Sequence, residues 1–137
     1  QIQRSGAVVE VEPLPACLGD KGQINQVFSN LLGNALKYLD PSRPGAIRIS
    51  GRIEKDRVVY CVQDNGLGIP AEHQSRVFEV FYRGGGSSED GEGLGLSIVR
   101  KIVDRHDGEV WVESEVGMGS RFYVSLPTAP ENGSLAP

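Results

Sequence analysis

The chain has 137 residues, enough for one domain with its own core. Hydrophobic residues make up 39% and charged residues 23%, an ordinary globular composition that excludes a wholly disordered chain. The net charge of -4 argues against an unassisted nucleic-acid surface. It still allows a nucleotide ligand, because backbone amides, a metal ion and a few local cations can hold a polyanion.

Hydrophobic periodicity predicts the elements in chain order, beginning with a short edge strand at Ala7–Val11. Apolar residues at helical spacing then predict a long helix that begins after an N-cap at Asp20 and ends before Pro41. Two strands follow at Ala46–Ile53 and Arg57–Gln63, joined by a tight charged turn.

The second half of the chain continues this alternation. A short helical segment is predicted at Ala71–Val80, and a second amphipathic helix at Leu94–His106. The segment Arg83–Gly93 between them is rich in glycine, serine and acidic residues, so it has little to bury and we expect it to be mobile. Two more strands are predicted at Glu109–Glu113 and Arg121–Leu126.

This order of elements predicts an α/β fold, a two-layer sandwich with a mixed sheet on one side and helices on the other. We expect residues 1–127 to form the one domain and the small, polar residues 128–137 to form a flexible tail. No apolar run approaches the length of a membrane span and no signal peptide opens the chain. These features predict a cytoplasmic domain without direct membrane insertion, in a parent protein that a membrane could still anchor.

The two cysteines, Cys17 and Cys61, are far apart and have apolar surroundings. Two such residues make neither a zinc site nor a disulfide scaffold. We interpret them as reduced, buried thiols.

The polar side of the long helix carries amides at helical spacing. One stripe opposite the apolar face contains Gln23, Gln26, Asn30, Asn34 and Lys37. Such a stripe often only faces water. However, asparagine is a poor helix former, and Asn30 and Asn34 stand one turn apart. Because an amide oxygen is a suitable neutral ligand for Mg²⁺, the stripe indicates a candidate metal site.

A second polar cluster, Asp64 to Ile69, directly follows a predicted strand. An ordinary Asn-Gly turn would explain it. Alternatively, Gly66 and Gly68 would let the backbone approach a flat ligand closely. A carboxylate at Asp64 can accept a hydrogen bond from the exocyclic amine of adenine, whereas guanine and inosine nucleotides present an acceptor there.

A third cluster, Gly91 to Leu96, enters the second long helix. Glycines before a helix N-terminus expose backbone amides to an anion. The loop is neither a Walker A loop, which needs a following Gly-Lys-Ser/Thr, nor a Rossmann fingerprint, since Leu96 replaces the third glycine. A glycine-rich loop is weak evidence by itself.

Taken together and in this order, the clusters resemble the catalytic ATP-binding domain of bacterial sensor histidine kinases. This family is a branch of the superfamily that includes gyrase-type and chaperone ATPases. The matching segments are residues 30–38 (N box), 64–69 (G1 box), 78–83 (F box) and 91–96 (G2 box), followed by the closing strands in 108–127. The resemblance implies a Bergerat-type fold, with a mixed, mostly antiparallel sheet on about three helices and residues 83–92 as a mobile ATP lid.

The resemblance also implies roles for single residues. Asn34 would ligate Mg²⁺ and Asn30 would support the phosphate side, while Lys37 and Tyr38 would reach the phosphates or the ribose. Arg83 is a candidate for steadying the γ-phosphate. The adenine would contact Asp64, Gly66, Gly68 and Ile69, and the G2 residues near the phosphates would be Gly93, Leu94, Gly95 and Leu96. Phe78 and Phe81 would pack at the base of the lid or in the core.

Residue 30 distinguishes two chemistries. In the hydrolysing relatives a glutamate stands one turn before the metal-binding asparagine and activates water. Asn30 cannot accept a proton at neutral pH, so the resemblance implies that the γ-phosphoryl group passes to a histidine on a separate dimerisation domain of the same parent. A response regulator would act downstream. We interpret His73 and His106 as structural or solvent-facing and expect this domain alone to be monomeric.

Alternative functions remain open. The first is a hydrolysing ATPase of the same superfamily, which Asn30 and the short chain oppose. The second is a non-catalytic nucleotide-binding module, although Asn34, Asp64 and the G2 glycines give no sign of degeneration. Serine kinases that share the boxes are a further class, opposed by the F box and the closing strands. One departure from the family is Asp107, where glycine is frequent; we expect it to alter only a turn.

Overall fold

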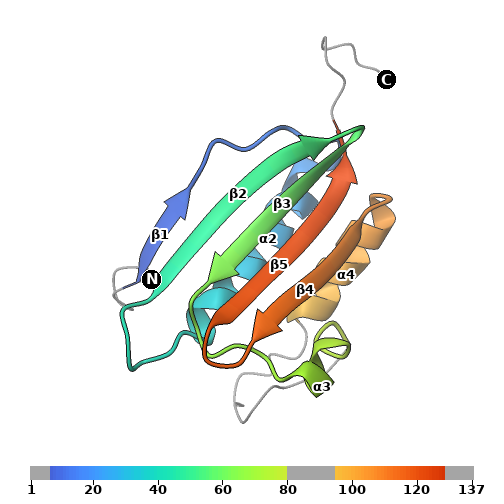
Figure 1. The fold of residues 1–137 in the computed structure, drawn as a ribbon. Coiled ribbons are helices and arrows are strands. Elements are labelled where there is room, and N and C mark those ends of the chain that lie inside the picture. The colour runs from blue at the N-terminus through green and yellow to red at the C-terminus, as the bar shows by residue number, and fades with distance from the viewer. Residues whose placement is uncertain (1–6, 80–94, 129–137) are drawn as a thin grey trace.

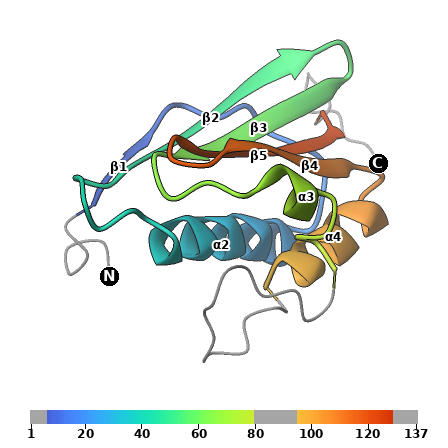
Figure 2. The same ribbon diagram turned by 60° about the horizontal axis from the view of Figure 1, so that its bottom comes forward.

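A computed structural model describes residues 7–79 and 95–128 of the chain. It confirms the predicted α/β two-layer sandwich. Within the described residues, a five-stranded sheet forms one layer and three helices cover one face of it (Figures 1 and 2). The expected ATP lid, residues 83–92, and nearly all of the expected tail lie outside the described residues.

The sheet is mixed and mostly antiparallel, in the strand order β1-β2-β3-β5-β4. Its strands are β1 (Val8–Val11), β2 (Ala46–Glu54), β3 (Arg57–Asp64), β4 (Glu109–Glu115) and β5 (Gly119–Pro127). Only the edge strand β1 pairs in parallel, with β2, and the other neighbours are antiparallel. This register places Asp64, the last residue of β3, between Ile47 and Ser120 of the adjacent strands.

The two long helices form where the apolar periodicity predicts them. Helix α2 (Lys21–Lys37) begins after Asp20, whose carboxylate accepts a hydrogen bond from the backbone N–H of Gln23 at 2.8 Å and so acts as the predicted N-cap. Helix α4 (Gly95–Arg105) ends shortly before Asp107, which has a φ of 60°. Asp107 thus lies in a turn, and Asp is among the residues that tolerate this conformation.

The core lies between the sheet and these two helices. Its fully buried side chains come from both layers, and the largest are Phe122, Leu31, Ile47, Leu126, Val27, Val58, Val62, Val99, Val103 and Val124. Phe78 is also buried and packs edge-on against Phe122, with ring centroids 6.0 Å apart. Phe78 is thus a core residue, and Phe81 lies outside the described residues. Burial of this apolar surface is the main force that joins the layers.

The helix predicted at Ala71–Val80 is wrong in length. Helix α3 covers only Ala71–Gln74, and the chain then continues in turns up to residue 79. Backbone hydrogen bonds here span three residues, from His73 to Pro70, Arg76 to His73 and Glu79 to Arg76. Such bonds make tighter turns than an α-helix. They allow the neighbouring residues Val77 and Phe78 both to be buried.

The histidine and cysteine predictions can be checked in part. His106 has a structural role, because its Nδ1 bonds to the Ile102 carbonyl at 2.8 Å and its Nε2 accepts from the Asp20 backbone N–H at 3.1 Å. Both cysteines are free thiols. Cys61 is buried and burial raises its pKa, whereas Cys17 is only half-buried, against the expectation. In the described parts of the chain, none of the helices has the length and apolarity needed to cross a membrane.

Candidate functional site

The predicted site segments meet at one end of the sandwich. There the end of β3 faces the last turn of α2, with α3 and the β4–β5 turn beside it (Figures 1 and 2). The start of α4 lies against the middle of α2, because the side-chain amide of Asn30 donates a hydrogen bond to the Gly95 carbonyl at 3.2 Å. The structure therefore brings the amide-bearing helix, the segment after Asp64 and the described start of the third cluster, Gly95, to one region.

Asp64 is a buried carboxylate at this end of the sheet, with 7% of its surface exposed. Its Oδ1 accepts a hydrogen bond from the Gly66 N–H at 2.8 Å. Burial raises the pKa of the Asp64 carboxyl, and backbone hydrogen bonds from Gly66 and Ser120 counteract part of this rise. Two backbone donors thus fix a carboxylate whose desolvation makes it a strong acceptor for a further polar hydrogen.

The last turn of α2 is joined to the G1 segment by backbone contacts. The Tyr38 N–H donates to the Asn34 carbonyl at 3.2 Å, and the Tyr38 carbonyl accepts from the Leu67 N–H at 3.0 Å. A Cβ on Gly66 would lie 2.4 Å from that same Tyr38 oxygen. Only glycine allows this close approach, so Gly66 is what brings Asp64 and the N-box helix together.

Gly68 makes a similar contact on the other side of the loop. It has a φ of 82°, and a Cβ there would lie 2.2 Å from the Glu115 carbonyl oxygen at the end of β4. The next residue, Ile69, donates its N–H to the Ser114 hydroxyl at 2.8 Å and packs against the core. Both glycines are therefore required by contacts within the protein, and their part in shaping an adenine pocket stays a prediction.

Two other polar N-box residues, Asn34 and Lys37, stand three positions apart and so lie on the same side of α2. Asn34 is half-buried, and Lys37 is exposed in the last turn with its ammonium 5.4 Å from the Tyr38 ring centroid. No group of three or more His, Cys, Asp or Glu residues that could hold a metal ion occurs in residues 7–79 and 95–128.

The G2 segment is described only from Gly95 onwards. Gly95 opens α4, and a Cβ there would meet none of the described atoms within 4 Å. Leu96 is half-buried and packs against the core. Arg83, Gly93 and Leu94 lie outside the described residues.

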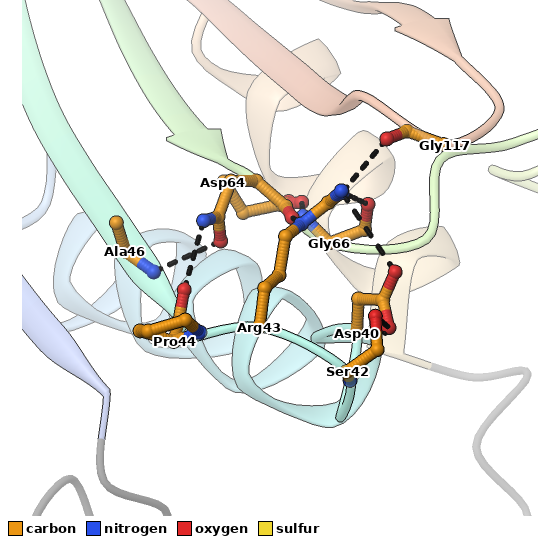
Figure 3. Close-up of polar contacts among 9 residues, drawn as sticks. Asp40, Ser42, Arg43, Pro44, Ala46, Asp64, Gly66 and Gly117 are labelled. Carbon is orange, nitrogen blue, oxygen red and sulfur yellow. Dashed lines mark hydrogen bonds and ion pairs between the residues drawn. The ribbon is translucent and has the colours of Figure 1, made fainter.

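Arg43, which lies in the loop between α2 and β2, was not among the residues to which the sequence analysis assigned a role. Its guanidinium donates to three backbone carbonyls, those of Asn65, Gly66 and Gly117, at 2.9, 2.9 and 2.8 Å (Figure 3). The only sequence signal is a single cation in a loop of prolines and a glycine. Ser114 and Gln74 were also not identified from the sequence. The side-chain amide of Gln74 donates hydrogen bonds to the Ile69 and Ser114 carbonyls, each at 2.9 Å.

Comparison with known proteins identifies the family. Residues 19–130 match the model described as "Histidine kinase-, DNA gyrase B-, and HSP90-like ATPase". The chain is 42% identical over 128 residues to the phytochrome-like protein Cph1 of Synechocystis sp., a match that covers 93% of this chain and 17% of Cph1. It spans less than a fifth of the length of the first curated relatives it matches.

Two solved structures share the fold at similar identity. The mycobacterial sensor histidine kinase MprB has a TM-score of 0.81 at 30% identity, over 93% of this chain and 88% of that one. Full-length ShkA in complex with AMPPNP has a TM-score of 0.79 at 31% identity, over 93% of this chain and 27% of that one. With the buried Asp64, these matches show that the chain belongs to the histidine kinase-, DNA gyrase B- and HSP90-like ATPase family and corresponds to the ATPase domain found in sensor histidine kinases.

Proposed function

We propose that this domain binds ATP with Mg²⁺ and donates the γ-phosphoryl group to a histidine on a separate dimerisation domain of its parent protein. The observation that carries the proposal is the buried Asp64 carboxylate, fixed beside the last turn of the helix that bears Asn30 and Asn34. An acceptor for the base and an amide for the metal then lie at the same end of the domain.

The adenine end of the site rests on Asp64. Its carboxylate would accept a hydrogen bond from the exocyclic amine of adenine. A guanine or inosine nucleotide would place an oxygen there, and two acceptors facing each other in a buried site are costly. The ATP analogue in the similar ShkA structure supports a nucleotide as the ligand.

The phosphate end would be formed by α2 and the start of α4. The amide oxygen of Asn34 would be the one protein ligand of Mg²⁺, since this ion keeps several water and phosphate ligands. Lys37, together with Arg83 and the backbone amides of Gly93–Leu96, would face the phosphates. Asn30 would act mainly by holding the N-box helix against the G2 segment, because its amide already donates to Gly95.

The proposed transfer to histidine, rather than to water, follows from the absence of a carboxylate at position 30. A carboxylate there could remove a proton from water, whereas the Asn30 amide cannot. Bound ATP would then wait for an imidazole nitrogen, which would form the new N–P bond as the bond between the γ-phosphorus and the leaving ADP oxygen breaks. Such a transfer needs mainly alignment and charge neutralisation. The phosphorylated histidine would serve a downstream response regulator.

A transfer assay tests this proposal. The chain is incubated with γ-labelled ATP, Mg²⁺ and the dimerisation domain of its parent, and the products are tested for acid-labile phosphate. We expect labelling of the dimerisation domain, with loss of labelling in Asn34→Ala and in a partner that lacks the acceptor histidine. Steady phosphate release by the chain alone, abolished by Asn34→Ala, would instead support the hydrolysing alternative.

Calorimetry tests the adenine contact separately. Asp64→Ala should weaken ATP binding by roughly 10- to 100-fold, the effect of losing a hydrogen bond to a charged group. An unchanged affinity in Asp64→Ala would show that Asp64 does not contact the base.

A further inference from the structure

Arg43 connects three loops that come from distant parts of the chain. Its Nε donates to the Asn65 carbonyl, and its Nη2 donates to the carbonyls of Gly66 and Gly117 (Figure 3). The side chain is 35% exposed, and the nearest carboxylate, that of Asp40, is 3.9 Å from Nη2. The guanidinium therefore directs its hydrogen bonds to backbone carbonyls, which it can bind in a fixed fork geometry.

Two of these carbonyls belong to the Asn65–Gly66 and Gly66–Leu67 peptide groups, shortly after Asp64. In the first group, Arg43 holds the Asn65 oxygen while the Gly66 N–H donates to Asp64 Oδ1 at 2.8 Å. In the second, Arg43 holds the Gly66 oxygen while the Leu67 N–H donates to the Tyr38 carbonyl at 3.0 Å. Each peptide group is thus held at both ends, with a cation at its oxygen, and neither can rotate without losing a charge-assisted hydrogen bond.

The loop that carries Arg43 is itself fixed. The Asp40 carboxylate accepts from the backbone N–H and the hydroxyl of Ser42 at 2.8 and 2.7 Å, which shapes the turn before Arg43. On the other side, the Asn65 amide donates to the Pro44 carbonyl and accepts from the Ala46 N–H, both at 2.9 Å. Arg43 thus binds the loop that contains Asn65, and the Asn65 side chain binds the loop that contains Arg43. These reciprocal hydrogen bonds fix the position of the guanidinium.

We propose that Arg43 is a positioning residue for base selectivity, which orients the Asp64 carboxylate toward the amine of adenine by fixing the two peptide groups after it. This inference rests on the proposed function, in which Asp64 reads that amine. Arg43 does not touch the nucleotide in this proposal. Its effect should depend on whether the ligand carries the amine, and a merely structural role would not produce that dependence.

The test compares two ligands, ATP and purine riboside triphosphate, which lacks the exocyclic amine. Their affinities are measured by calorimetry with Mg²⁺ for the wild-type chain and for Arg43→Gln. We expect Arg43→Gln to weaken ATP by about tenfold, as for one lost hydrogen bond, and to change the affinity for the analogue little. The preference for ATP over the analogue should fall by the same factor.

Two further variants make the comparison sharper. Arg43→Lys keeps the charge but cannot bind the carbonyls with the same planar fork, so it should retain an intermediate preference for ATP. Arg48→Gln is the matched control, because Arg48 is an exposed arginine of β2 that pairs with Glu12. It should leave both affinities unchanged. Thermal unfolding without ligand shows whether each variant is folded. If Arg43→Gln does not fold, the comparison of the two ligands is made with Arg43→Lys instead.

The outcomes separate the two proposals. Equal weakening of both ligands in the Arg43 variants, or no weakening of either, would overturn the role of Arg43 while leaving Asp64 as the adenine contact. A wild-type chain that binds both ligands equally well would instead remove the adenine contact of Asp64, and the inference about Arg43 with it.

Discussion

The centre of the sandwich and the end of the sheet around Asp64 are both buried, yet different interactions hold them in place. In the centre, side chains such as Val58, Val103 and Leu126 have no exposed surface and only apolar neighbours are needed to fix them. Around Asp64, backbone donors and the Arg43 guanidinium fix single atoms. Stability and the proposed ligand recognition would thus be assigned to separate regions.

The reason for this division is physical. Apolar burial is non-directional, and a core tolerates exchanges that keep its volume. A carboxylate that accepts a hydrogen bond from one particular amine must be held in a defined orientation, and directional hydrogen bonds supply that orientation. Changes in the core should therefore alter the free energy of unfolding, and changes around Asp64 should alter nucleotide affinity.

The largest effect is expected in the core. Leu126→Ala removes a side chain with no exposed surface, and the cavity should lower the free energy of unfolding by about 2–5 kcal/mol in urea titrations. The volume-conserving Leu126→Met should cost less than about 1.5 kcal/mol. The folded fraction of both variants should bind ATP like the wild type. A change in its preference for ATP would show that the two regions are not separable.

At the other region, Gly66→Ala should affect binding more than folding. The new Cβ would lie 2.4 Å from the Tyr38 oxygen, so the loop must shift and Asp64 loses the Gly66 N–H in its present place. ATP affinity should fall by about tenfold or more in calorimetry.

Gly33→Ala is the control for Gly66→Ala, because Gly33 lies within α2 and an added Cβ there would meet no atom of residues 7–79 and 95–128 within 4 Å. It should raise the free energy of unfolding by about 0.5–1 kcal/mol. A Gly66→Ala variant that binds ATP like the wild type would show that the close contact between Gly66 and the Tyr38 carbonyl is not needed for binding.

The smallest effect is a pH dependence. Burial raises the pKa of Asp64, so the folded state binds a proton more readily than the unfolded state. The contribution of Asp64 to stability therefore rises as the pH falls through its raised pKa, and it is lost on return to neutral pH. Asp64→Asn lacks this contribution. The unfolding free energy of the variant minus that of the wild type should accordingly be larger at about pH 7 than at about pH 4.

Asp40→Asn provides a control of opposite sign. The hydrogen bonds from Ser42 lower the pKa of Asp40, so its contribution is present at neutral pH and is lost as the pH falls through that lowered value. The deficit of Asp40→Asn relative to the wild type should shrink on acidification. The same trend in both variants would contradict the assignment of Asp64 as a carboxyl destabilised by burial.

Much of the fold was predictable because it depends on apolar periodicity. The two long helices, their N-cap at Asp20 and all five strands follow from spacing and side-chain type. The helix at Ala71–Val80 was wrong because tight turns bury Val77 and Phe78 side by side, and periodicity does not distinguish such turns from a helix.

The site was predictable only where a side chain signals its role. A carboxylate and two glycines directly after a strand indicated Asp64, Gly66 and Gly68. Arg43 could not be found in this way, since its partners are carbonyls 22 to 74 residues away and every residue type has a carbonyl. Its contacts, and the role proposed from them, depend on the packing of three loops, which is a property of the fold.

The two long helices, α2 and α4, run in opposite directions and are joined by two hydrogen bonds, one near each end of α4. Asp20 at the start of α2 bonds to His106 just beyond the end of α4, and Asn30 bonds to Gly95 at the start of α4. Sliding either helix along the other by one turn would break both bonds at once. These two hydrogen bonds therefore disfavour a translation of one helix along the other. We expect a displacement of either helix to move both together as one rigid unit.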